Sequence, residues 1–215
     1  MSRSERSGIF VSFEGIDGCG KSTLLAQLSA WLKAAGIPHI QTREPGGTLL
    51  GEALRSVLLD SSFPGMHPWA EALMYGAARA QHVSEVILPA LKRGHWVLTD
   101  RYADATMAYQ GYGRGLDIGR LDQIHRWTTG DLRPDVSVLL DCSVATAAER
   151  RLSRRDKPDR LEQLDTDFHE RVRSGYLEQA ASDSGRFLVL DADRSIEAVT
   201  EDFRNYLKQR LGLDV

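Results

Sequence analysis

Cysteine is nearly missing from this chain of 215 residues, which contains only Cys19 and Cys142. The two lie far apart in the sequence, and neither belongs to a CxxC motif or to a Cys/His cluster. This scarcity excludes a disulfide framework and gives no support to a zinc site. Two isolated thiols suit a reducing compartment, so we expect a cytoplasmic protein.

A surplus of positive charge is missing too, because 27 Lys and Arg stand against 30 Asp and Glu, a net charge of -3. With a pI of about 6.1 the chain has no global positive field, so we expect neither nucleic acid nor a membrane as a partner. Residues 1–8 are polar and lack the apolar core of a signal peptide or a transmembrane helix. We interpret them as a short disordered leader. Any anion-binding site must therefore be local.

What is present is an alternation of apolar runs with stretches of helical spacing. The runs that suit buried strands are 9–13, 95–98, 136–140 and 187–190, with a weaker one at 39–42. Residues 69–87 keep apolar side chains three and four positions apart, as one face of a long helix requires. Such alternation predicts right-handed crossovers and a three-layer α/β sandwich around a parallel sheet of about five strands. Without a repeat or a flexible linker, the sequence predicts one domain, 1–215.

The segment 15–22 matches GxxxxGK[ST], directly after an apolar run and at the start of a helical stretch. Its glycines allow the backbone to wrap around phosphate oxygens, and the amides of the helix N-terminus bind the anion. Lys21 is predicted to reach the β- and γ-phosphates, and the Ser22 hydroxyl to take a position on Mg²⁺. The predicted ATP-binding residues are Gly15, Ile16, Asp17, Gly18, Cys19, Gly20, Lys21, Ser22 and Thr23. The alternative, a glycine-rich turn with an accidental lysine, would explain neither the apolar run before the segment nor the helical stretch after it.

GTPase switches, motor ATPases and kinases all use such a loop. The only asparagine is Asn205, followed by Tyr206, so the Asn-Lys-x-Asp motif that reads guanine is missing. The strand expected to bind metal ends in Asp100 and Arg101 instead of the acidic run of a motor ATPase. Asp100 is predicted to hold Mg²⁺ through water and Arg101 to direct its donors at phosphate, unless they form only a local ion pair. The pattern favours a kinase.

Two groups of side chains are suited to binding a base. Tyr75 and Arg79 are four residues apart on the predicted long helix, so they present a ring and a guanidinium on one face. Thr106, Tyr109 and Gln110 share a face in the same way if 104–110 is helical. Stacking combined with donors aimed at a carbonyl suits a pyrimidine. The alternative is that Tyr75 belongs to the core and Arg79 is a solvated helix residue.

The segments 13–17 and 43–48, the pair Tyr75 and Arg79, and the segment 100–110 follow one another along the chain. In this order and spacing they resemble the thymidylate kinases, from about residue 9 to about residue 193. The resemblance implies the nucleoside monophosphate kinase fold and a homodimer. It also implies transfer of the γ-phosphoryl of Mg-ATP to dTMP, which gives dTDP in the synthesis of dTTP.

The resemblance implies roles for the residues around the base. Tyr75 takes the stacking position, where phenylalanine is more usual, and Arg79 takes the position that bonds the thymine carbonyl. Thr106 and Gln110 would read the base edge. Tyr109 would crowd the 2′ carbon of the sugar, so that deoxyribose is preferred.

Three further residues are assigned to the sugar and the phosphate of the acceptor. A carboxylate inside the phosphate loop needs a partner other than polyphosphate, and the resemblance implies that Asp17 binds the 3′-hydroxyl. Arg43 and Arg101 are predicted to hold the acceptor phosphate in line with the γ-phosphate.

Residues 150–160 carry six basic side chains in eleven positions. They form a solvated face, a nucleic-acid patch or a lid whose arginines close over the transferring phosphoryl and exclude water. No arginine lies at positions 16–19 of the loop, so the chain resembles the branch whose catalytic arginines come from the lid. The predicted catalytic residues are Lys21, Arg101, Arg151 and Arg155, with Arg154 as a rival and Arg160 assigned to ATP.

Two alternatives stay open from the sequence. One is a kinase for another monophosphate, such as uridylate or guanylate, or for a small alcohol, against which Tyr75, Arg79 and Gln110 argue. The other is a regulatory nucleotide-binding protein without transfer, which the loss of Lys21 or of the lid arginines would have favoured.

Overall fold

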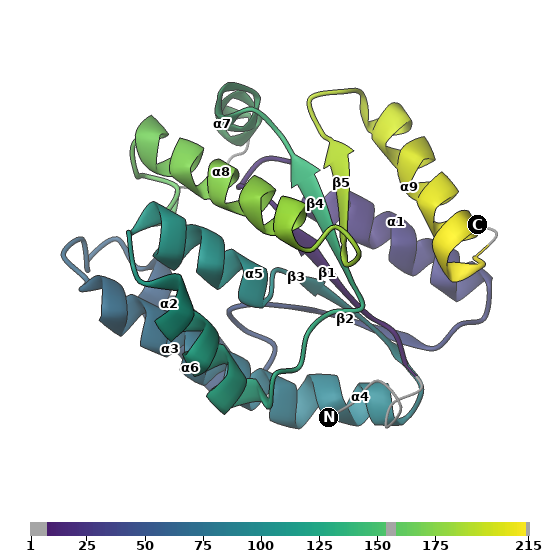
Figure 1. Cartoon of the computed structure of the whole chain (residues 1–215), viewed down its shortest axis with the longest axis horizontal. Helices are drawn as coiled ribbons and strands as arrows, with labels where there is room; N and C mark the ends of the chain where they lie inside the picture. The colour runs from purple at the N-terminus through teal and green to yellow at the C-terminus, as the bar shows by residue number, and fades with distance from the viewer. Residues whose placement is uncertain (1–7, 154–157, 214–215) are drawn as a thin grey trace.

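The computed structural model describes residues 8–153 and 158–213, and its centre is a sheet of five parallel strands (Figure 1). The strands are β1 Phe10–Glu14, β2 His39–Arg43, β3 Trp96–Asp100, β4 Val136–Asp141 and β5 Phe187–Asp191. They pair in the order β2-β3-β1-β4-β5, which confirms the predicted parallel sandwich. All but the last residue of the predicted leader, and Arg154 and Arg155 of the predicted lid, lie outside the described residues.

Helices cover both faces of the sheet, so β1 is buried on both sides. Phe10 meets Tyr102 at a centroid distance of 4.9 Å, and Phe13, on the opposite face, meets Phe203 at 6.0 Å. α1 and α9 lie on the Phe13 face, and α4, α5 and α8 on the other (Figure 1). The helices are α1 Lys21–Ala34, α2 Leu49–Leu59, α3 Pro68–His82, α4 Leu88–Lys92, α5 Ala103–Thr106, α6 Ile118–Thr129, α7 Val144–Leu152, α8 Thr166–Ser182 and α9 Ile196–Leu211, with π-helical turns η2 Val83–Ile87 and η3 Met107–Gly113.

Both helices predicted near the site contain a wide π-helical turn. The predicted helix 69–87 is α3 followed by η2, and α4 begins at Leu88 with Pro89 in its first turn. Proline lacks an amide hydrogen, which suits the first turn of a helix. The predicted helix 104–110 is α5 followed by η3. Such turns are frequent at functional sites, and η3 carries Tyr109 and Gln110.

The carboxyl ends of β1, β2 and β3 meet at one edge of the sheet. In the strand register, Phe13 of β1 and Arg43 of β2 both pair with Asp100 of β3. The glycine-rich segment 15–22 follows β1 directly, and Arg101 follows β3. Open parallel sheets bind their ligands at this edge. The topology therefore gathers the predicted phosphate-binding residues from three separate segments.

Both cysteines are free and buried. The Cys142 thiol, at the end of β4, donates to Asp193 Oδ1 over 3.4 Å. Burial and the Asp193 carboxylate raise the pKa of this thiol to about 12, so it is unreactive near neutral pH. In the part of the chain that the structure describes, no helix combines the length and the apolar character needed to cross a bilayer.

Candidate active site

The phosphate loop is built on glycines in the left-handed region of backbone space. Gly15 has φ 130° and Gly18 has φ 96°. A Cβ atom at Gly18 would lie 2.4 Å from the Ala147 carbonyl oxygen of α7, so only glycine fits there. Lys21 Nζ donates to the carbonyl oxygens of Gly15 and Ile16, each over 3.1 Å. The lysine is thus held inside the loop that it is predicted to serve.

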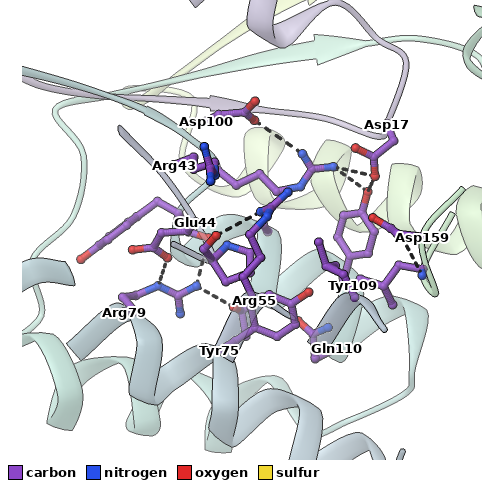
Figure 2. Close-up of a pocket in the computed structure, with 17 residues that line it drawn as sticks. Asp17, Arg43, Glu44, Arg55, Tyr75, Arg79, Asp100, Tyr109, Gln110 and Asp159 are labelled. Atoms are coloured by element: carbon purple, nitrogen blue, oxygen red, sulfur yellow. Dashed lines mark hydrogen bonds and ion pairs between the residues drawn. The ribbon is translucent and has the colours of Figure 1, made fainter. Parts of the chain in front are cut away.

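Asp17, Arg101 and Tyr109 form a closed cluster at the pocket; Figure 2 shows Asp17 and Tyr109 pointing toward each other. Arg101 Nη2 lies 3.0 Å from Asp17 Oδ2 and donates to the Tyr109 hydroxyl over 2.9 Å. The Tyr109 hydroxyl in turn donates to Asp17 Oδ2 over 3.2 Å. Burial alone would raise the pKa of Asp17, but the charges of Arg101 and Lys21 hold that pKa well below its usual range. Asp17 is therefore ionised and rigidly placed.

Arg101 has φ 68°, a left-handed conformation that is strained for any residue other than glycine. Its Nη1 also lies 3.6 Å from Asp100 Oδ1. Strained residues that the surroundings hold in place cluster at functional sites. The backbone conformation therefore directs the guanidinium between the carboxylates of Asp17 and Asp100.

Ser22 and Asp100 provide oxygen atoms suited to Mg²⁺. The Ser22 hydroxyl donates to Asp100 Oδ2 over 3.4 Å. Asp100 Oδ1 is buried and makes no hydrogen bond among the described residues; its contact with Arg101 Nη1 at 3.6 Å leaves it able to accept from water or to bind a metal ion. Within the same residues, no group of three His, Cys, Asp or Glu could hold a metal by itself. The donor set fits an ion shared with phosphate oxygens, the usual arrangement for Mg²⁺ in kinases.

A pocket opens beside this cluster, lined by residues of the loop, α2, α3, α5 and η3 and by Asp159 and Leu161 (Figure 2). Its wall includes every residue predicted to bind the acceptor: Asp17, Arg43, Tyr75, Arg79, Arg101, Thr106, Tyr109 and Gln110. Their roles in binding stay predictions, but the structure brings all of them together. Arg43 also pairs with Glu52 at 2.9 Å, in a largely exposed ion pair.

Arg79 is buried, with only 3% of its surface exposed, so the alternative of a solvated helix residue is wrong. Its Nε donates to Glu44 Oε2 over 2.7 Å, and its Nη2 donates to Thr106 Oγ1 over 2.8 Å. The sequence analysis gave Glu44 no role, although it stands in the segment 43–48. It also missed Arg55, which lines the pocket from α2 and donates to the Pro45 carbonyl oxygen over 3.0 Å.

Glu71 is fully buried and contacts Gln110, Arg114 and Arg160. The sequence did not reveal this role. Gln110 Nε2 donates to Glu71 Oε1 over 2.7 Å, and Arg114 Nη2 donates to Oε2 over 3.1 Å. Arg160 Nη2 lies 2.6 Å from the same Oε2 as an ion pair without hydrogen-bond geometry. Burial raises the pKa of Glu71, but the bonds from Arg114 and Gln110 outweigh it and keep the acid ionised.

Arg151 and Arg160, both assigned to the predicted lid, lie in different parts of the site. Arg151, in the last turn of α7, donates from Nη1 to the Asp17 carbonyl oxygen over 2.7 Å, so it lies at the phosphate loop. Arg160, whose assignment to ATP stays a prediction, is buried beside Glu71, and its Nε donates to the Leu58 carbonyl oxygen over 2.8 Å. The physical reason is the buried charge of Glu71, which requires a cation.

A glycine-rich GxxxxGK[ST] loop beside a pocket and an Asp–Arg cluster, on a 2-3-1-4-5 parallel sheet, defines a P-loop nucleoside monophosphate kinase fold. The family model described as thymidylate kinase matches residues 13–203. The chain is 52% identical to the thymidylate kinase of Desulforudis audaxviator, over 87% of this chain and 85% of the relative. It is also 52% identical to that of Deinococcus radiodurans (87% and 90% covered) and 47% identical to that of Pelotomaculum thermopropionicum (91% and 90% covered). The chain belongs to the thymidylate kinase family.

Proposed function

We propose that this protein transfers the γ-phosphoryl group of Mg-ATP to dTMP and so makes dTDP for dTTP synthesis. The observation that carries the proposal is the position of Arg101. It lies between Asp100, beside the phosphate loop, and Asp17 and Tyr109, at the mouth of the base pocket. Donor and acceptor phosphates bound on these two sides would meet at its guanidinium.

The transfer needs positioning and charge neutralisation more than covalent chemistry. A phosphate monoester oxygen is already ionised near neutral pH, so no general base is required. Lys21 and the lid residues Arg151 and Arg155 would stabilise the γ-phosphoryl, while Arg43 and Arg101 hold the acceptor phosphate in line. Mg²⁺, held through Ser22 and Asp100, would neutralise charge on the β- and γ-oxygens.

Thymine selection is supported by the composition of the pocket. Tyr75 offers a ring for stacking, and the Arg79 guanidinium is fixed with part of its donor set facing the pocket. The amide nitrogen of Gln110 donates to Glu71, so the side-chain carbonyl oxygen of Gln110 would accept a hydrogen bond from the base. One acceptor and a set of donors suit the N3–H and carbonyl edge of thymine.

The activity can be tested by coupled ADP release with Mg-ATP and each of dTMP, dUMP, UMP, CMP, GMP and AMP. We expect the highest kcat/KM with dTMP. Replacing Arg79 with alanine should raise the KM for dTMP by roughly 10- to 100-fold, because a charged donor to the base is lost. Arg120→Ala, on the exposed surface of α6, should leave the KM unchanged. Equal turnover of purine monophosphates would refute the thymine assignment, and no acceptor-dependent ADP release would refute the kinase.

We also propose a single kinase domain over 1–215 with a lid at about 150–160, and a location in the cytoplasm. Arg151 at the phosphate loop and Arg160 beside the pocket support a lid that bridges the donor and acceptor sides. The two buried free thiols support a reducing compartment.

A homodimer is supported by apolar side chains on the adjacent helices α2, α3 and α6 (Figure 1). Leu49, Leu73 and Trp127 are 92%, 54% and 81% exposed, and large apolar side chains exposed on neighbouring helices are typical of a protein–protein contact surface. Light scattering should give twice the chain mass of 23.9 kDa for the wild type and the chain mass for Leu73→Asp. Leu152→Asp, at a leucine on α7 that is 86% exposed, should stay dimeric. A monomeric wild type would refute the dimer.

A further inference from the structure

The Arg79 guanidinium is fixed by protein groups on several sides. Nε donates to Glu44 Oε2, and Nη2 donates both to Thr106 Oγ1 and to the Tyr102 carbonyl oxygen, over 2.8 Å and 3.3 Å. Within the described part of the chain, Nη1 is the one nitrogen of this group without a hydrogen-bond partner. Because Arg79 lines the pocket, Nη1 is the nitrogen that remains for a base. Its direction depends on the groups that hold Nε and Nη2.

Glu44 is hydrogen-bonded to His82, which does not line the pocket. It is buried and uses one oxygen for Arg79 and the other for His82, whose Nδ1 lies 3.0 Å from Oε1. Burial would raise the pKa of Glu44, but the charge of Arg79 and the His82 bond more than offset this and keep it ionised. An ionised carboxylate only accepts hydrogen bonds, so His82 Nδ1 carries the hydrogen. The imidazole thus fixes the plane of the carboxylate that fixes Arg79.

The other nitrogen of the imidazole is fixed as well. His82 Nε2 lies 2.6 Å from Thr42 Oγ1 of β2, and His82 has no exposed surface. With the hydrogen bond to Glu44 made at Nδ1, Nε2 is the ring nitrogen that pairs with the Thr42 hydroxyl. Gly47 closes over the pair so tightly that a Cβ atom there would lie 2.6 Å from Oγ1 and 2.7 Å from Nε2. Thr42, His82 and Glu44 form a continuous polar relay that ends on Arg79.

We infer that His82 is a positioning residue for base selection, which acts through Glu44 to direct Arg79 Nη1 at a carbonyl on C4 of a pyrimidine. The inference rests on the proposed function and adds a determinant that does not touch the substrate. A correctly aimed N–H donor binds the C4 carbonyl of thymine and meets a second donor in the C4 amino group of cytosine. Without His82, Glu44 Oε1 loses its donor, the carboxylate turns, and Arg79 turns with it.

The test is steady-state kinetics of His82→Leu with dTMP and with dCMP. We expect the KM for dTMP to rise about tenfold and the kcat/KM ratio of dTMP to dCMP to fall about tenfold, while the KM for ATP changes less than twofold. His82→Asn places an amide N–H near the position of Nδ1, so it should recover most of both values. Thr42→Val should shift the ratio about threefold in the same direction, and Thr42→Ser, which keeps the hydroxyl, should not.

The Thr42 pair decides the question if His82→Leu fails to fold, because valine has nearly the shape of threonine and serine removes only one methyl group from a half-buried side chain. A merely structural role for His82 would lower the melting temperature and leave the dTMP to dCMP ratio unchanged in every variant. That result, with normal dTMP turnover by the wild type, would overturn the relay alone. A wild type that does not turn over dTMP would overturn the proposed function together with the relay.

Discussion

Replacing Arg101 with alanine is expected to lower kcat by about a thousandfold and to leave the Kd for ATP nearly unchanged. The guanidinium is largely buried and fixed by Asp17, Tyr109 and Asp100, so its donors need no reorganisation during the reaction. Without it, the ionised Asp17 would face the acceptor phosphate with one cation fewer. Single-turnover rates and calorimetric titration with ATP would measure the two quantities.

The left-handed backbone of Arg101 offers a matched control. At φ 68° glycine is relaxed and alanine is strained, so Arg101→Gly should be more stable than Arg101→Ala by about 1 kcal/mol. Both variants lack the side chain and should lose the same activity. Arg101→Lys keeps a charge but loses the planar donor set, and should retain only about 1% of kcat. A kcat of Arg101→Ala within tenfold of the wild type would contradict the placement of this arginine at the phosphates.

The parts of the site that the sequence predicted are those whose signal is local. The loop 15–22 carries its spacing within eight residues, and Asp100 and Arg101 stand at the end of an apolar run. The strands β1, β3 and β4 were recognisable because parallel strands buried on both faces are continuously apolar, whereas the partly exposed β2 gave only a weak run. The strand order β2-β3-β1-β4-β5 was not predicted, because it depends on how the helices pack between strands distant in sequence.

The residues that the sequence did not reveal include two buried acids, Glu44 and Glu71. Glu71 on α3 looks like a solvent-facing residue in an amphipathic pattern, and its partners Gln110 and Arg160 lie 39 and 89 positions further along the chain. The contact between Glu44 and His82 was not predicted for the same reason, because 38 positions separate the two residues in the sequence. Arg160 was assigned to ATP because it belongs to the basic segment 150–160. A run of basic residues in a sequence does not show which of them binds phosphate and which forms a buried ion pair. The π-helical turn η3 was missed because periodicity over seven residues does not separate it from an α-helix.

Replacing Glu71 with alanine should lower the free energy of unfolding by about 3–5 kcal/mol. The substitution leaves Arg160, which is 5% exposed, and Arg114 without their buried counter-charge and leaves the Gln110 amide without an acceptor. Denaturation in urea at fixed protein concentration would measure the loss, since association would otherwise contribute. Asp202→Ala, which removes an exposed ion pair with Arg194, should cost less than about 1 kcal/mol.

A double substitution separates the charge from the packing in this effect. Glu71→Leu with Arg160→Met replaces the buried pair by apolar side chains, and it should recover part of the stability lost in Glu71→Ala. The same double variant should not recover dTMP binding, because Gln110 still lacks the carboxylate that fixes its amide. If Glu71→Ala kept wild-type stability, the ion pair with Arg160 would be too weak to hold that arginine on the acceptor side. Arg160 would then be free to serve ATP as the sequence predicted, and Arg160→Ala would raise the KM for ATP instead of that for dTMP.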